Sequence, residues 1–354
     1  MMKTYKLHRL LVLLCFAISF MGCDLVHEFP DDNPVDPSLI DVEIVLSVDI
    51  KFPTDTLPKP STYALSGLTA DTEEGNHHFR YIVDIYETDP NGSTALSNRI
   101  KRLVQTEPTH PEGLYELKDT LKLPAKKYML IAWIDFVDAG SQADKYHNTE
   151  DLQNVSILNP YGQYEGYSTV RDAWTAKEIM DLTPYAGKRY YHHTAEMKVK
   201  RPYAIYQVIT TDIEAYNTYH QTSYASVQPD LTKVRYSLWH PMSLNTYLNA
   251  PIVFTGGISY THKNWDAVPG KEKVIASDYV FVDEKEENFS SQISFDILTA
   301  DEKIINRIDL KIDRLKQNRL VIVKGEFLTK DLNDNGGVGI DDRFDDEIVI
   351  HLPF

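Results

Sequence analysis

The sequence predicts an all-β protein, and three observations support this fold class. Apolar and polar residues alternate with a period of two along many short segments, which is the pattern of half-buried strands. Tyrosine and phenylalanine are abundant, at 22 and 13 residues, and aromatic side chains are favoured on pleated surfaces. Turn clusters rather than amphipathic helices separate the strands, which favours antiparallel sandwiches over a parallel α/β sheet.

The first 22 residues are predicted to be a signal peptide. Residues 1–9 are basic, and residues 10–21 form an apolar run that only Ser19 interrupts. A helix of this length spans about 18 Å, which is too short for the roughly 30 Å hydrocarbon core of a bilayer. The run therefore fits the apolar part of a signal peptide and not a transmembrane helix.

The signal peptide ends at a candidate lipidation site. Phe20-Met21-Gly22-Cys23 resembles the lipobox that lipoprotein signal peptidase reads, with Phe20 where leucine is usual. The resemblance implies diacylglycerol on the Cys23 sulfur, cleavage before Cys23 and acylation of its amine, for example with palmitate. Two or more acyl chains anchor a protein stably to a membrane. The alternative is an ordinary secretory signal followed by a chance cysteine.

The residues after Cys23 predict an extended tether and an acidic body. Residues 23–40 are acidic and rich in proline, which is typical of a spacer. The chain carries a net charge of −16, and such a surface repels phosphate backbones, so no nucleic-acid partner is expected. Because Cys15 lies in the signal peptide, Cys23 is the only thiol of the mature chain, and no disulfide is expected.

The N-terminal sandwich is predicted over residues 41–200. Its strands are expected at residues 42–52, 79–85, 114–118 and 127–137. A tyrosine-rich excursion follows from Asp144 to Ile179, with a short helix expected near residues 170–180. Aromatic side chains of this excursion could form an exposed binding surface, and the candidates are Tyr161, Tyr164, Tyr167 and Trp174. The alternative is that they pack the excursion onto the body.

The C-terminal sandwich is predicted over residues 201–354. Arg201-Pro202 follows a strand and marks the boundary. The expected strands are residues 204–212, 234–239, 252–260, 278–283, 292–298, 305–312, 320–329 and 346–352.

Short segments across most of the mature chain resemble a family of Bacteroidetes-type surface lipoproteins, itself similar to fimbrillins and fimbrial anchor or accessory proteins. The matching segments include Phe79-Arg80-Tyr81-Ile82-Val83, Ala132-Trp133-Ile134-Asp135-Phe136-Val137-Asp138, Gly140-Ser141, Tyr146-His147-Asn148-Thr149, Arg171-Asp172-Ala173, Arg201-Pro202, Ser277-Asp278-Tyr279-Val280-Phe281-Val282, Gly325-Glu326-Phe327-Leu328-Thr329 and Gly336-Gly337-Val338-Gly339-Ile340-Asp341. The resemblance implies two tandem transthyretin-like or immunoglobulin-like domains on a lipid anchor in the outer membrane, exposed at the cell surface. It also implies a fimbrial accessory, anchor or adhesion role, with fimbrial subunits as partners, and it brings no catalytic residues.

One loop has the ligand spacing of a calcium site. Asp331, Asn333, Asn335 and Asp342 occupy positions 1, 3, 5 and 12, and Gly336 occupies position 6. Asp342 replaces the usual bidentate glutamate, and the flanking segments are predicted strands rather than helices. The alternative is a hairpin loop rich in asparagine and glycine. Apart from this calcium site, no cofactor is expected.

The other candidate sites favour no enzyme. The pairs His77-His78 and His192-His193 place their side chains on opposite faces of a strand, so neither pair chelates one metal alone. No nucleophile elbow or phosphate-binding glycine loop is present. A second functional hypothesis is a glycan-binding lipoprotein of a polysaccharide-uptake system, since the aromatic faces of the excursion could stack on sugars.

Overall fold

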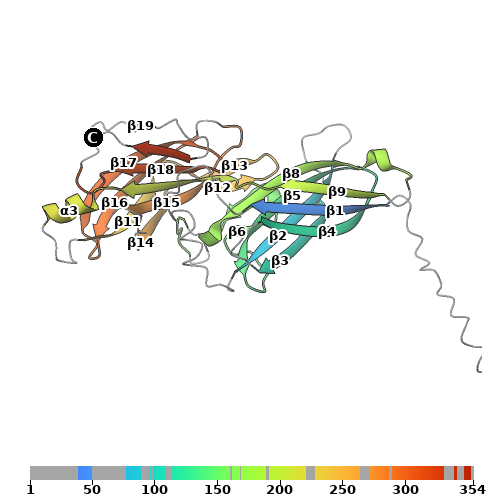
Figure 1. The fold of residues 1–354 in the computed structure, drawn as a ribbon, viewed down its shortest axis with the longest axis horizontal. Coiled ribbons are helices and arrows are strands. Elements are labelled where there is room, and N and C mark those ends of the chain that lie inside the picture. The colour runs from blue at the N-terminus through green and yellow to red at the C-terminus, as the bar shows by residue number, and fades with distance from the viewer. Residues whose placement is uncertain are drawn as a thin grey trace, which may run out of the picture.

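The computed structural model describes residues 39–49, 77–88, 96, 99–108, 114–159, 162–167, 169–188, 191–220, 228–263, 272–286, 289–330, 339–340 and 347–351. Two bodies built almost entirely from strands lie end to end along the long axis of the molecule (Figure 1). The prediction of an all-β sandwich fold is confirmed. Among the described residues, no helix is both long and apolar enough to cross a membrane.

Two sheets make up the first sandwich. The three-stranded sheet has the order β4 (Leu114–Pro124), β1 (Leu39–Asp49), β9 (His192–Lys198), and the four-stranded sheet has the order β3 (Arg99–Pro108), β2 (His77–Glu87), β5 (Lys127–Asp138), β8 (Ala173–Asp181). β1 pairs antiparallel with β4 and parallel with β9. The first and last strands of this sandwich are therefore direct neighbours.

The core of the first sandwich follows from the alternation of apolar residues. Val42 of β1, Val83 of β2 and Leu130 of β5 all face the space between the two sheets and are at most 2% exposed. The strands β2 and β5 are also buried on their other face. That second face lies against the C-terminal half of the chain, and it explains why residues 127–137 form a nearly continuous apolar run.

The helix expected near residues 170–180 does not form. A single 3-10 turn, Thr169–Arg171, precedes β8, and β8 pairs antiparallel with β5 from Asp135↔Ala173 to Lys127↔Asp181. The prediction was wrong because the apolar residues of this segment recur at a helical spacing, whereas the open edge of β5 offers a complete ladder of backbone partners.

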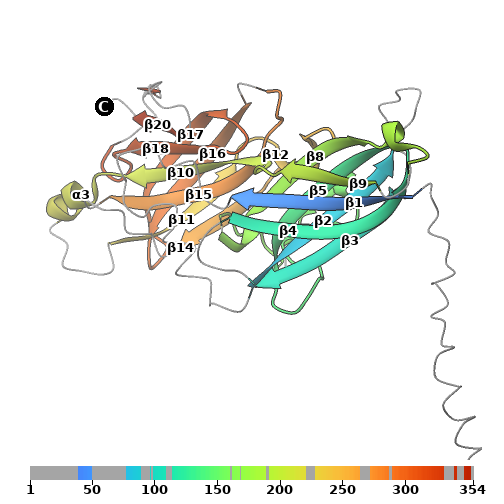
Figure 2. The same cartoon turned by 45° about the vertical axis from the view of Figure 1, so that its right-hand side comes forward.

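The second sandwich contains nine strands among the described residues. A five-stranded sheet has the order β15 (Lys273–Phe281), β10 (Tyr203–Thr210), β18 (Leu320–Gly325), β20 (Glu347–His351), β19 (Gly339–Ile340), and a four-stranded sheet has the order β14 (Ser259–Lys263), β11 (Pro229–Tyr236), β16 (Phe289–Thr299), β17 (Ile304–Leu315). The helix α3 (Ile213–Tyr219) follows β10 at the end of the molecule farthest from the first sandwich (Figures 1 and 2). Val234, Phe295 and Val321 are fully buried between the two sheets.

A further four-stranded sheet joins the two bodies, and we call it the junction sheet. It has the order β13 (Ala250–Thr255), β12 (His240–Asn245), β7 (Val155–Ile157), β6 (His147–Asn148). Its last two strands come from the tyrosine-rich excursion, whereas β12 and β13 belong to the C-terminal half. In both views β12 lies where the two bodies meet (Figures 1 and 2). The expected strand at residues 252–260 is in fact two strands, β13 and β14, separated by a turn at Gly257.

Candidate functional site

The junction between the two sandwiches holds several buried polar and charged residues. Backbone pairing connects the two halves directly, because Val155 and Ser156 of β7 pair with Leu244 and Ser243 of β12. An apolar cluster fills the space behind this sheet and includes residues of both halves. Its largest members are Trp133, Tyr86, Tyr203, Tyr279 and Phe281.

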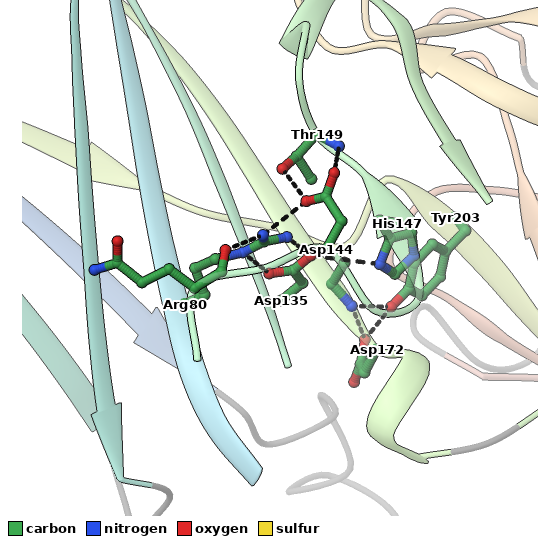
Figure 3. Close-up of polar contacts among 9 residues, drawn as sticks. Arg80, Asp135, Asp144, His147, Thr149, Asp172 and Tyr203 are labelled. Atoms are coloured by element: carbon green, nitrogen blue, oxygen red, sulfur yellow. Dashed lines mark hydrogen bonds and ion pairs between the residues drawn. The ribbon is translucent and has the colours of Figure 1, made fainter. Parts of the chain in front are cut away.

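Arg80 is the centre of the first polar group (Figure 3). It stands directly opposite Asp135 on adjacent strands, and its guanidinium donates two bonds to the Asp135 carboxylate, from Nε to Oδ1 at 2.9 Å and from Nη2 to Oδ2 at 2.7 Å. Its Nη1 donates to Asp144 Oδ1 at 2.7 Å and to the Gln142 carbonyl at 2.9 Å. Both Arg80 and Asp135 are at most 2% exposed. Bidentate geometry and buried partners make this pair far stronger than a surface ion pair.

The two ends of this group respond to burial in different ways. Burial opposes the charge of Arg80, but the carboxylates of Asp135 and Asp144 outweigh it and raise the Arg80 pKa. Asp144 also accepts bonds from the backbone and hydroxyl of Thr149, and despite its burial the pKa of Asp144 is lowered. Asp144 thereby fixes the first turn of the excursion onto the edge of the sandwich.

Asp172, Arg201 and Tyr203 form the second polar group, at the point where the chain passes between the sandwiches. Arg201 donates from Nη2 to Asp172 Oδ2 at 2.7 Å and from Nε to Asp172 Oδ1 at 2.9 Å. The Tyr203 hydroxyl also donates to Asp172, as Figure 3 shows. The Arg201 guanidinium carbon lies 5.0 Å from the ring centre of Trp174, a cation–π distance. These contacts hold the connecting segment rigidly on both sides.

Tyr164 carries the excursion into the core of the second sandwich. Its hydroxyl donates to Asp278 Oδ2 at 2.8 Å and lies 3.1 Å from His240 Nε2. Asp278 also accepts from the Tyr236 hydroxyl at 2.6 Å and from the Tyr279 backbone at 2.8 Å. Burial raises the pKa of the Asp278 carboxyl to about 6, and burial with the nearby Arg171 charge lowers the pKa of His240 to about 3.

Gly166 allows Tyr164 to enter that core. Its φ is +72°, and a Cβ at this position would lie 2.5 Å from the Tyr260 ring. Only glycine combines this backbone conformation with so close an approach. The turn brings Arg171 back over Tyr164, with 4.9 Å between the guanidinium carbon and the ring centre, and the Gly166 carbonyl accepts a bond from Arg171.

The junction has the chemistry of a clamp, a name used here for Arg80, Asp135, Asp144, Asp172, Arg201, Tyr203, Tyr164 and Asp278. A cavity lined by His147, Arg171, Tyr203 and Phe281 has a volume of about 10 Å³, which is enough for about one water molecule. His147 is fully buried, and its Nδ1 lies 3.7 Å from Asp135 Oδ2, too far for a hydrogen bond. Burial lowers the pKa of His147, so it stays neutral beside Trp133. The carboxylates of Asp135, Asp144, Asp172 and Asp278 all accept hydrogen bonds from arginine or tyrosine side chains here.

Comparison with known proteins identifies the family of the chain. The model of a family described as "Family of unknown function (DUF6562)" matches residues 38–353. The chain belongs to this family. A search of curated proteins finds no match.

Solved structures similar to this member of the DUF6562 family come from Bacteroidetes. A fimbrial assembly protein from Parabacteroides distasonis has 12% identity, a TM-score of 0.42 and coverage of 89% of this chain and 100% of that chain. The fimbrial anchor protein Mfa2 from Porphyromonas gingivalis has 11% identity, a TM-score of 0.39 and coverage of 77% and 82%. The tip fimbrial protein Mfa3 from Porphyromonas gingivalis, with a C-terminal truncation, has 11% identity, a TM-score of 0.36 and coverage of 77% and 81%. At these TM-scores the likenesses carry no argument about function.

The structure describes three of the four residues predicted as a binding surface. Tyr164 and Trp174 are 7% and 1% exposed, so the expectation of an exposed aromatic surface is wrong for them. Trp174 packs edge-on against Phe79 in the first core, and Tyr167 is half-buried and stacks on Tyr279 at 4.9 Å. Tyr161 lies outside the described residues. These aromatic residues pack the excursion onto the body, because burying their large rings against other side chains is more favourable than leaving them in solvent.

Most of the other predicted sites lie outside the described residues. Cys23 and the loop residues Asp331, Asn333, Asn335 and Asp342 are outside the described residues, so lipidation and calcium binding stay predictions. His77 lies 3.4 Å from Lys145 Nζ, and His192 lies 3.5 Å from Glu43 Oε2. In the described part of the chain no three His, Cys, Asp or Glu side chains form a metal-binding group.

Apart from Tyr164, which was predicted to bind a ligand, the residues of the clamp were not predicted as functional. Arg80 occupies a position that alternates with core residues, so a period-two pattern assigns it to a solvent-facing side. Asp278 shares its alternate positions with the core residues Ala276 and Val280, and the pattern does not reveal its partners. One signal was available: Arg80, Asp135 and Asp84 are charged residues inside otherwise apolar central strands, and a charge in such a strand requires a buried partner.

Acidification is expected to stabilise the fold through Asp278. Its pKa is about 6 in the fold against an ordinary value of 3.8, so the folded protein binds this proton more tightly than the unfolded chain. The stabilisation is therefore complete below about pH 3.8 and is lost as the pH rises through about 6. At 1.36 kcal/mol per pKa unit, this shift of the Asp278 pKa contributes on the order of 3 kcal/mol to the free energy of unfolding at low pH.

Denaturant unfolding of the parent chain and of Asp278→Asn between about pH 7.5 and about pH 4 measures this contribution. The parent free energy of unfolding minus that of the variant should rise by about 3 kcal/mol on acidification, because asparagine does not titrate. In the fold a pKa of about 3 keeps His240 neutral over this range, and its protonation in the unfolded chain lowers the stability of parent and variant alike, so its effect cancels in the difference. A difference that stays constant or falls with acidification would contradict the prediction.

Proposed function

We propose that this chain is a lipid-anchored protein of the cell surface with a fimbrial accessory, anchor or adhesion role, and that it performs no catalysis. Three features support the proposal: the lipobox-like Phe20-Met21-Gly22-Cys23, the sequence resemblance to fimbrial anchor and accessory proteins, and the clamped junction. The junction is the main support, because its buried ion pairs and tyrosines hold the two sandwiches together as one body.

An enzyme is the alternative that the Asp278 cluster brings to mind. A carboxyl with a raised pKa beside tyrosines and a histidine is the chemistry expected of an acid–base site. Asp278 is fully buried, however, and its oxygens are occupied by Tyr164, Tyr236 and the Tyr279 backbone. A general acid or base must reach its substrate within hydrogen-bond distance, so this cluster supports a structural role.

The glycan-binding hypothesis rested on the aromatic residues of the excursion, and Tyr164 and Trp174 among them are buried. Stacking on a sugar needs an accessible aromatic face, whereas Trp174 is enclosed by Phe79, Phe136 and the Arg201 guanidinium. A body whose two domains are clamped together at their junction suits a protein that transmits position or force. We therefore favour a base or accessory role at the surface.

Cells that lack the chain, complemented with the parent, Cys23→Ser or Cys15→Ser, test this proposal. The parent and Cys15→Ser should fractionate with the outer membrane and yield an acylated N-terminal Cys23 peptide, whereas Cys23→Ser should lose at least ten-fold of its membrane fraction, since a chain without acyl groups has no stable anchor. Fimbriae should be fewer, altered in length or detached in the deletion strain and with Cys23→Ser.

Two results would contradict different parts of the proposal. A Cys23 peptide that still carries upstream residues contradicts lipidation. Fimbriae unchanged in number, length and attachment in the deletion strain contradict the fimbrial role, whatever the state of Cys23. Cys15→Ser is the matched control, because it removes the other thiol of the chain from a segment expected to be cleaved away.

A further inference from the structure

One end of the first sandwich is the end at which β1 begins, and we call it the tether end. The strand pairing brings several strand ends together there. Leu39 of β1 pairs with Pro124 of β4, and β9 starts beside β1. In the other sheet, Lys127 of β5 pairs with Asp181 of β8. Both views show that this end points away from the second sandwich (Figures 1 and 2).

Lysines gather at the tether end of an otherwise acidic chain. Among the described residues, the last three positions of each strand at this end and the turns between those strands hold five exposed lysines and three carboxylates. Arg99 also lies there and pairs with the buried Asp84. The chain as a whole carries a net charge of −16, so the tether end has the opposite sign. The lysines are Lys101, Lys122, Lys126, Lys127 and Lys188, and the carboxylates are Asp41, Glu87 and Asp181.

Two stacked tyrosines accompany these lysines in the connection from β8 to β9. A 3-10 turn, Thr183–Tyr185, follows β8, and the ring centres of Tyr185 and Tyr191 are 3.7 Å apart. Lys188 Nζ lies over both rings, 5.2 Å and 5.8 Å from their centres. Both rings are half-buried and pack against the core of the first sandwich, which fixes their position. Tyrosine and lysine side chains are favoured at the boundary between lipid headgroups and water.

We propose that the tether end rests on the headgroups of a bilayer that contains anionic lipid. This inference rests on the proposed lipid anchor, because residues 23–39 would connect the acyl chains at Cys23 to the start of β1. The 16 residue steps from Cys23 to Leu39 span at most about 55 Å when fully extended. The anchor therefore keeps the start of β1 within that distance of the membrane.

Charge and geometry favour a bilayer as the occupant of the tether end. Anionic headgroups attract lysines that lie close to the surface, and they repel the acidic remainder of the chain. Both effects turn the tether end toward the membrane. The lysines lie at the ends of both sheets, because they come from β3, β4, β5 and the adjoining turns. A planar surface can contact all of them at once, whereas a single extended segment such as the acidic tether reaches only some.

Fluorescence quenching on the acylated chain tests the proposal. The full chain with Ala186→Cys, purified with its acyl groups, is labelled at the new thiol and placed in vesicles of phosphatidylethanolamine and phosphatidylglycerol that contain a spin-labelled lipid. Ala186 is exposed and directly follows Tyr185. Its label should be quenched at least three-fold more strongly than a label at Tyr219→Cys, because only the tether end contacts headgroups. Tyr219 is 80% exposed on α3, at the opposite end of the molecule.

Charge reversal distinguishes headgroup contact from mere tethering. Three exposed lysines of the tether end are changed in the labelled chain: Lys101→Glu, Lys122→Glu and Lys188→Glu. Quenching of the Ala186→Cys label should fall at least three-fold, because anionic lipid then repels this end. The matched control makes the same change in net charge on exposed lysines of the second sandwich and should not lower the quenching. Its substitutions are Lys263→Glu, Lys285→Glu and Lys303→Glu.

Vesicle flotation and mass spectrometry of the N-terminal peptide separate this inference from the lipid anchor. If the chain floats with an acylated Cys23 and the Ala186→Cys label is quenched no more than the Tyr219→Cys label, the inference is overturned and the anchor stands. The acidic tether covering this end would give that result. Quenching that survives the charge reversal at the tether end also overturns the inference. A chain that lacks acyl groups and does not float overturns both proposals.

Discussion

Arg80→Met is expected to lower the free energy of unfolding by about 3–5 kcal/mol, because it removes one partner of a buried ion pair. Asp135 is 1% exposed and would lose both of its bonds from the guanidinium. Asp144 would lose its cation as well. Denaturant unfolding followed by the fluorescence of the buried Trp133 and Trp174 measures the change.

Arg307→Met is the matched control for this substitution. Arg307 also stands directly opposite an aspartate on the neighbouring strand, Asp296, but its side chain is 59% exposed. Asp296 keeps a second cation, Arg235, when Arg307 is removed. Asp296 is buried, but its cation Arg307 is mostly exposed and Arg235 remains to pair with it, so Arg307→Met should cost only about 1 kcal/mol, close to the range of exposed pairs. Equal costs at the two sites would show that burial does not decide the strength of these pairs.

Tyr164→Ala is expected to destabilise the protein by about 3–5 kcal/mol, the usual cost of removing a buried aromatic ring. The substitution also leaves Asp278 without one donor and removes the contact that carries the excursion into the second sandwich. Limited proteolysis should then cut residues 144–172 of the excursion much faster than in the parent chain, because the anchor of the excursion is lost.

Tyr164→Phe distinguishes the ring from the hydroxyl. The phenylalanine ring keeps the packing against Tyr260 and His240 and loses the contacts of the hydroxyl with Asp278 and with His240 Nε2. A lost buried hydrogen bond costs about 1–3 kcal/mol, so this variant should lie between the parent and Tyr164→Ala. If Tyr164→Ala were as stable and as protease-resistant as the parent, the clamp would not hold the excursion.

The strands that the sequence predicts correctly are those with a clear apolar alternation or a continuous apolar run. Residues 42–52, 79–85 and 127–137 overlap β1, β2 and β5, and most of the strands expected after Arg201 overlap observed ones. β12 was missed because His240, Pro241 and Ser243 interrupt any apolar alternation. That strand forms because β7 and β13 supply its backbone partners, and such partners lie far away in sequence.

The clamp was beyond sequence reasoning for a related reason. Asp278 and Tyr164 are 114 residues apart, and nothing in the local pattern of either predicts their contact. Arg80 was assigned to the polar side of its strand, and that side is buried because a second sandwich covers it. In the sequence, tyrosines in a polar, glycine-containing stretch are typical of an exposed surface, and only the structure shows that Gly166 turns Tyr164 inward. The residue types indicated their chemistry, but the sequence did not reveal which residues contact one another.

The parallel pairing of β1 with β9 has a mechanical consequence. Seven residue pairs, from Asp41↔His192 to Ser47↔Lys198, connect the two strands in the same direction. If tension acts between the start of β1 and the end of β9, it slides the strands past each other. All the ladder bonds then resist in shear at once, whereas an antiparallel neighbour pulled from adjacent ends would peel apart one bond after another. A chain fixed at its N-terminus and pulled from its second sandwich would meet this stronger resistance.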